Sequence, residues 1–194
     1  LFILFLTLFQ SIHSQKSASL DKVHVLIPPI YQDVKDFSEG MAAVKNENKW
    51  GFVNKYGEII IDLKYQDAKI FSEGLAAVKL SGKWGFIDAT GKVVIPFRYK
   101  EVKDFKEGIA AVNLDGFWGG VNQKGEEVIP FDYDFIYSFS EGLAVVVKGE
   151  YVQDAGQIYK EGENHSFVNR SGKETIMMFE RKVLPFQEDL APVK

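Results

Sequence analysis

The sequence predicts an all-β protein that is built from tandem antiparallel units of about 34 residues. Three patterns share this interval: a Trp-Gly pair, a Phe-x-Glu-Gly segment and a tyrosine. The Trp-Gly pairs are Trp50 and Gly51, Trp84 and Gly85, and Trp118 and Gly119; the segments end at Gly40, Gly74, Gly108 and Gly142; the tyrosines are Tyr31, Tyr65, Tyr99 and Tyr133. Three residue types in one register indicate a repeat, which has to be recognised before secondary structure is assigned.

One unit, residues 71–104, divides into three strands joined by two hairpin turns. The strands are expected at 75–79, 83–88 and 92–96. The first turn is Ser81-Gly82, and the second runs from Asp88 to Gly91, where glycine adopts a positive φ at little cost. Because the stretch 99–108 shows no clean alternation, we expect a connecting loop there, with or without a helical turn.

The alternation of side chains predicts how the units stack. In a strand over 84–87, Trp84 and Phe86 point to one side, and Gly85 and Ile87 to the other. Gly85 has no side chain, so a neighbouring backbone or ring can approach it closely. Units that bury their aromatic faces only against neighbours predict an open, twisted array. A closed β-propeller is the alternative; its blades usually need four strands and about forty residues.

The fourth unit carries an insertion. His165-Ser166 stands where a Trp-Gly pair is due, and its distance from Trp118 exceeds the repeat interval. The polar, acidic segment 148–164 is expected to leave the stack as an extended hairpin or loop. Insertions in repeat arrays often lie on a binding face, which makes Tyr151 and Tyr159 candidate binding residues. An inert surface loop is the alternative.

The first residues predict export. Residues 1–9 are almost entirely apolar and are followed by a polar stretch, which is typical of a signal peptide and too short to span a bilayer. We expect a signal peptide over 1–14, lacking its start, and one repeat domain over 15–194 in the periplasm, at the cell surface or secreted. This mature domain is not expected to span a membrane. A buried N-terminal strand or helix is the alternative.

Composition excludes several classes of chemistry. There is no cysteine, which removes disulfides, thiolate catalysis and cysteine zinc sites, and which is more typical of exported bacterial than eukaryotic domains. The net charge is −4, with acids and bases interspersed, so no basic face for nucleic acid is expected. Without the signal peptide only His24 and His165 remain, and no catalytic motif is present. We therefore predict no catalytic residues, metal or cofactor, although a two-histidine metal site stays open.

Two regular rows of side chains have a structural and a functional interpretation. The three tryptophans are expected to form the core of each unit, with a ligand-stacking row as the alternative. One glutamate recurs in each unit, and we expect it to accept backbone N–H bonds in its own turn or to pair with Lys49 or Lys83. A row that binds cations or a basic partner is the alternative. These glutamates are Glu39, Glu73, Glu107, Glu141 and Glu188.

The pattern KWGF(I/V)(D/N)xxGK, followed by IP, Tyr and FSEGLAAVK, resembles the WG-repeat (KWG-repeat) family of bacterial proteins. The resemblance covers residues 28–194 and is most specific over 37–147; Asp62 stands in place of the proline seen at Pro96 and Pro130, and Gly120 in place of Phe86. It implies exported or envelope-associated β-repeat modules without a shared catalytic set. We expect a non-catalytic interaction or scaffold module of the bacterial envelope that binds protein or cell-wall polymer. An envelope hydrolase acting at the insertion and a purely structural spacer are the alternatives.

Overall fold

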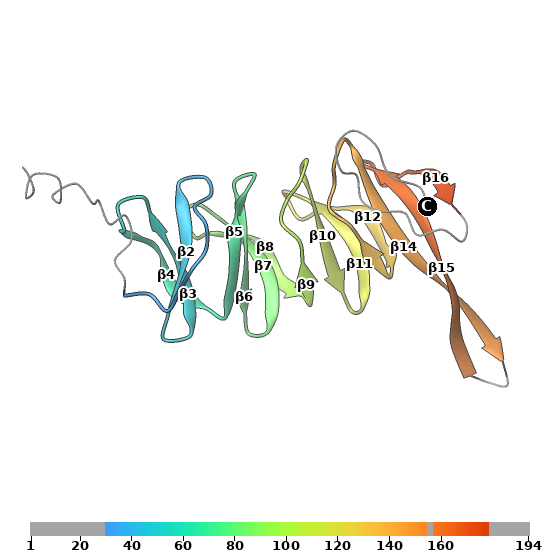
Figure 1. Cartoon of the computed structure of the whole chain (residues 1–194), viewed down its shortest axis with the longest axis horizontal. Helices are drawn as coiled ribbons and strands as arrows, with labels where there is room; N and C mark the ends of the chain where they lie inside the picture. Colours follow the sequence, from blue (N-terminus) through green and yellow to red (C-terminus); the bar gives the residue numbers. More distant parts are fainter. Residues whose placement is uncertain (1–29, 155–156, 179–194) are drawn as a thin grey trace, which may run out of the picture.

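The computed structural model describes residues 30–154 and 157–178, which form an all-β stack without a helix. Four antiparallel sheets of four strands lie one after another along the long axis of the molecule (Figure 1). The predicted signal peptide, His24 and Glu188 lie outside the described residues. The prediction of an open array of antiparallel units is confirmed, because the first and last sheets lie at opposite ends of the stack.

We number the sheets as units 1 to 4. Unit 1 contains β1 (Asp33–Val34), β2 (Met41–Asn46), β3 (Lys49–Asn54) and β4 (Ile59–Tyr65), and unit 2 contains β5 (Asp67–Ser72), β6 (Leu75–Leu80), β7 (Lys83–Asp88) and β8 (Val93–Tyr99). Unit 3 contains β9 (Glu101–Val102), β10 (Ile109–Leu114), β11 (Phe117–Asn122) and β12 (Glu127–Tyr133), and unit 4 contains β13 (Phe135–Ile136), β14 (Leu143–Asp154), β15 (Gln157–Asn169) and β16 (Glu174–Met178).

Each sheet has a fourth strand, which the sequence did not predict. The stretch expected to be a loop forms β9 in unit 3, where Val102 pairs with Val112 and the Lys103 N–H donates to the Ala111 carbonyl at 2.8 Å. It contains no helical turn. The sheets therefore have the strand number of propeller blades, so strand number was the wrong reason to set a propeller aside. What distinguishes the fold is that the sheets stack without closing (Figure 1).

The predicted turns are confirmed by their backbone angles. Ser81 and Gly82 have φ of 50° and 79°, as a two-residue type I′ hairpin requires. At the second turn, Gly91 has φ of 82°, and its N–H donates to the Asp88 carbonyl at 2.9 Å. The Asp88 carboxylate also accepts the Thr90 N–H at 2.9 Å. Glycine and aspartate thus fix the register of the hairpins.

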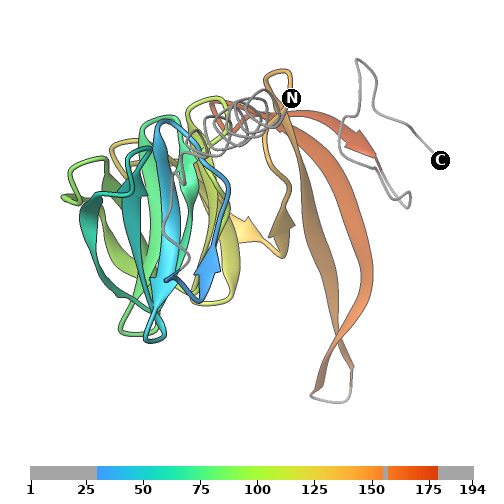
Figure 2. The same cartoon turned by 60° about the vertical axis from the view of Figure 1, so that its left-hand side comes forward.

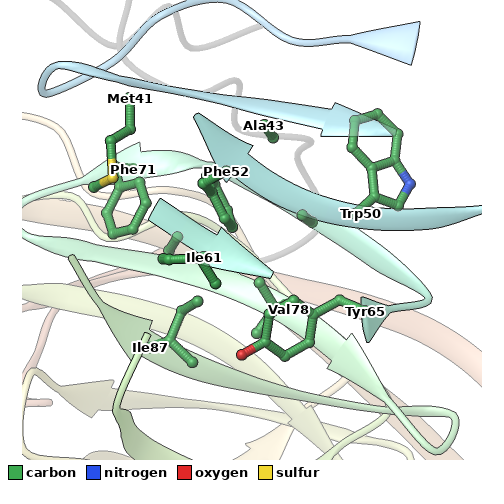
Figure 3. Packing of buried hydrophobic residues seen from close by; sticks show 11 residues of the cluster. Met41, Ala43, Trp50, Phe52, Ile61, Tyr65, Phe71, Val78 and Ile87 are labelled. Carbon is green, nitrogen blue, oxygen red and sulfur yellow. The ribbon is translucent and has the colours of Figure 1, made fainter. Parts of the chain in front are cut away.

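The core lies between the sheets, because each central strand is buried on both faces. Ile87 packs against unit 1, whereas Trp84 and Phe86 pack against unit 3 (Figure 3 shows the first junction). The rings of Phe52 and Phe71 meet edge to face at this junction, with centroids 4.9 Å apart. The three tryptophans are only 5–9% exposed, so their assignment to the core is confirmed.

The glycine of the Trp-Gly pair lies beneath a bulge of the edge strand. Trp84 pairs with Tyr99 and Phe86 with Ile95, so residues 96–98 of β8 lie opposite Gly85 alone. A Cβ at Gly85 would lie 2.7 Å from the Ile95 carbonyl oxygen and 3.0 Å from the Phe97 nitrogen. The expected close approach to this glycine is therefore confirmed.

Unit 4 departs from this geometry where its sequence departs from Trp-Gly. His165, Ser166 and Phe167 pair one to one with residues 178, 177 and 176 of β16, and no bulge lies opposite Ser166. Among the described units, the position after the tryptophan or its equivalent holds a residue with a Cβ only in unit 4, where the edge strand β16 has no bulge opposite it. The proline of the repeat lies within the bulge, on an edge strand, where a missing N–H is tolerated.

Candidate functional site

The most distinctive surface feature is the hairpin of β14 and β15, which extends beyond the stack (Figures 1 and 2). The two strands stay paired from Leu143 and Asn169 to Asp154 and Gln157, with one register shift after Glu150. Lys148 pairs with Asn164, as Leu80 pairs with Lys83 in unit 2. Residues 149–163 therefore replace the two-residue turn Ser81-Gly82. We call residues 148–164 the arm.

The arm holds both predicted binding residues, but they do not form one cross-strand pair. Tyr151 pairs with Lys160, and Tyr159 pairs with Val152. The two tyrosines therefore belong to neighbouring pairs of the ribbon.

The base of the arm is fixed to the stack. Lys148 forms an ion pair with Asp132 of unit 3, and Val147 is buried. β13 pairs with β14 only at Val146 and Val147. Within the described residues, β14 beyond Lys148 is therefore paired with β15 alone.

His165 lies in the stack and not on the arm. It pairs with Val147, is 7% exposed, and its Nδ1 atom has no hydrogen-bond partner in the described structure. Among the described residues, no group of three or more histidine, aspartate or glutamate side chains is placed to hold a metal ion. The described part of the chain also has no helix that is long and apolar enough to cross a membrane.

Three of the repeated glutamates, Glu39, Glu73 and Glu107, accept hydrogen bonds from the turn of the following unit, so the prediction that they serve their own turn is wrong for these three. The Glu73 carboxylate accepts the N–H groups of Glu107 and Gly108 at 2.6 and 2.7 Å. Glu39 and Glu107 bind the glycine N–H groups of the next turns in the same way, at 2.9 and 2.8 Å. We call this row the glutamate ladder.

The backbone of these turns explains the ladder. Glu73 has φ of 55° and Gly74 has φ of 83°, so the Glu-Gly pair forms a two-residue turn. The N–H groups of these two residues take no part in the hydrogen bonds between the two strands of the hairpin. A neighbouring carboxylate can then accept both N–H groups. A hydroxyl bond runs beside it, because Ser72 Oγ donates to the Phe105 carbonyl at 2.7 Å. The ladder thus joins units; Glu107 pairs with Arg170 and not with the predicted lysines.

A half-buried lysine lies among three rings where units 3 and 4 meet. Lys103 Nζ lies 4.1 Å from the centroid of the Phe135 ring, 5.1 Å from that of Tyr137 and 5.9 Å from that of Trp118. Burial, with a smaller contribution from the nearby Lys69, lowers the pKa of Lys103 to about 8. The ring faces favour the charged form, but desolvation is the larger effect. The shared register of Lys35, Lys69 and Lys103 was the sequence signal for this site, which was missed.

These features define a β-repeat scaffold in which Trp-Gly sheets stack and one hairpin projects. The family model for the WG containing repeat matches residues 24–50, 50–84, 84–116 and 118–151. The chain belongs to this family. No curated protein matches the sequence. A solved structure of a protein of unknown function from Bacteroides caccae is similar at 14% identity and a TM-score of 0.37, over 79% of this chain and 66% of that one.

Removing one rung of the ladder should destabilise the stack. Glu73→Gln keeps the shape of the side chain but removes the charge that strengthens two backbone hydrogen bonds. We expect the free energy of unfolding in urea to fall by about 1 kcal/mol. Glu141→Gln is the matched control, because Glu141 has the same φ of 55° and no hydrogen bond among the described residues. An equal effect of both substitutions would contradict a role for the ladder in stability.

The pKa of Lys103 predicts a rise in stability at alkaline pH. Its folded-state pKa of about 8 lies below the ordinary value of 10.5, so the unfolded chain binds more protons between these two values. Stability due to this residue should therefore increase as the pH rises through that window. Lys103→Met should abolish this increase in urea unfolding curves, whereas Lys124→Met, in the β11–β12 turn, should retain it. An unchanged pH profile in Lys103→Met would disprove the assignment.

Proposed function

We propose that this protein is a non-catalytic interaction module of the bacterial envelope, which binds a protein or a cell-wall polymer through its arm. The observation that supports this is the continuation of the unit 4 hairpin as a paired ribbon beyond the stack (Figure 2). The stack itself does not require this extension, because units 1 to 3 close the same hairpin with two residues.

The rest of the molecule fits the role of a rigid support. Central strands such as β6 and β7 are buried on both faces, and the ladder ties each unit to the next. Binding residues are commonly carried by segments that leave such a scaffold. The arm bears more acids than bases, with Glu150, Asp154, Glu161 and Glu163 against Lys148 and Lys160. This favours a partner with basic groups.

A hydrolase acting at the insertion has less support. Such chemistry needs a positioned proton donor or acceptor. His165 is the one histidine near the arm in the described part of the chain, and it lies buried in the sheet with Val147 opposite. The carboxylates of the arm would have to supply both acid and base by themselves.

The arm can be removed without breaking the repeat. Replacing residues 149–163 by Ser-Gly copies the turn at Ser81-Gly82 and should leave the circular dichroism spectrum and cooperative unfolding intact. We expect the wild type to be retained on purified cell-wall polymer or on immobilised envelope protein, and the armless variant to be lost. The full-length variant Tyr151→Ala/Tyr159→Ala should bind more weakly, because aromatic side chains often provide most of the binding energy.

The other outcomes are distinguishable in the same experiment. Equal binding by the wild type and the armless variant would place the interaction elsewhere and overturn the proposal. Turnover of the polymer by the wild type, lost when the four acids of the arm become amides, would identify a hydrolase. Absence of binding and turnover in the wild type would leave a structural spacer.

A further inference from the structure

One lysine recurs at the same position of units 1, 2 and 3, as Lys35, Lys69 and Lys103. The Nζ atom of Lys35 lies 3.6 Å from Oδ1 of Asp67, which belongs to unit 2. The Nζ atom of Lys69 lies 4.0 Å from Oδ1 of Asp104, which belongs to unit 3. The first two ammonium groups of this row are therefore each balanced by a carboxylate of the following unit.

The third lysine of the row, Lys103, lacks both of these carboxylates. In unit 4, Phe135 stands at the position of Asp67, and Ser138 stands at the position of Asp104. Among the described residues, Lys103 forms no ion pair and no hydrogen bond. The register of the repeat thus leaves this amine without an anionic partner from the described part of unit 4.

Aromatic rings surround Lys103 in place of the carboxylates. Its Nζ atom lies 4.1 Å from the centroid of the Phe135 ring and 5.1 Å from that of Tyr137. The Phe135 ring is held between two others, with its centroid 4.9 Å from that of Tyr137 and 5.2 Å from that of Trp118. Lys103 is only half-buried, so a small molecule can still reach the amine.

An amine in these surroundings is a nucleophile. Burial, together with the positive charge of the nearby Lys69, lowers the pKa of Lys103 to about 8. Part of the Lys103 population is then uncharged near neutral pH and has a lone pair that can attack a carbonyl carbon. Desolvation and a neighbouring cation are the two effects that activate lysines for Schiff-base formation.

We propose that Lys103 is a covalent attachment site for aldehydes, which it binds as a Schiff base. The amine nitrogen adds to the carbonyl carbon of the aldehyde, and a proton passes from this nitrogen to the oxygen. The resulting carbinolamine loses water and leaves a C=N bond, so no oxidant or reductant is consumed. The neutral imine suits the ring-lined site, because burial disfavours a charge there. This site uses no residue of the arm and does not depend on the function proposed above.

Reductive trapping with benzaldehyde tests this inference on the full chain. The protein is incubated near neutral pH with benzaldehyde and sodium cyanoborohydride, which reduces each imine to a stable secondary amine. Peptide mass spectrometry then gives the rate of modification at each lysine. We expect Lys103 to be modified about ten times faster than Lys35 or Lys69, because an ammonium group paired with a carboxylate offers no lone pair.

Two substitutions of Ser138 form a matched pair for this experiment. Ser138 is exposed, so Ser138→Asp and Ser138→Asn should both keep the circular dichroism spectrum of the wild type. Ser138→Asp restores the missing carboxylate and should slow the modification of Lys103 to the rate of Lys69, whereas Ser138→Asn should react like the wild type. Wild-type Lys103 that reacts no faster than Lys35 and Lys69 would overturn the proposal. Equal rates at Lys103 in the two variants would also overturn it, because the reactivity would then not come from the missing carboxylate.

Discussion

The close approach of the edge strand to the glycine after each tryptophan is the constraint on which the repeat depends. The bulge over Gly85 uses residues 96–98 and returns the strand to register at Tyr99, opposite Trp84. The repeated tyrosine therefore closes the bulge that lies over the Trp-Gly pair, although it follows that pair by a whole turn and lies at the end of β8. The one unit with His165-Ser166 has lost both the glycine and the bulge opposite it. Units 1 to 3 thus have both the glycine and the bulge, and unit 4 has neither.

Stacking follows from what this sheet leaves on its two faces. Trp84 and Phe86 pack against the next unit, and Ile87 packs against the previous one. Both faces of a single sheet are therefore apolar, and each has to be buried against a neighbouring sheet. The glutamate ladder adds direction, since each carboxylate is bound by the unit that follows it. A stack of this kind has two different ends. The stack also holds the base of the arm, through the ion pair between Lys148 and Asp132. An insertion at this point can project without disturbing the core.

The sequence predicted the parts of this structure that are local in the chain. The repeat, the two turns at Gly82 and Gly91, the buried tryptophans and the place of the arm were all deduced from spacing and turn chemistry. The fourth strand was missed because β9 is two residues long and is defined by its partner β10, with no alternation of its own. The ladder and the ring contacts of Lys103 were missed because both join neighbouring units. Side chains that lie one repeat apart meet only when the sheets stack, and sequence spacing alone does not say which faces meet.

The unfolding free energy of Gly85→Ala tests the central claim most directly. A Cβ at this position would meet backbone atoms of Ile95 and Phe97, which cannot move aside without opening the bulge. We expect a loss of about 3 kcal/mol. Gly74→Ala is the reference, because Gly74 has φ of 83° and open space around it, so only backbone strain of about 1–2 kcal/mol applies. A smaller loss for Gly85→Ala than for Gly74→Ala would contradict the account.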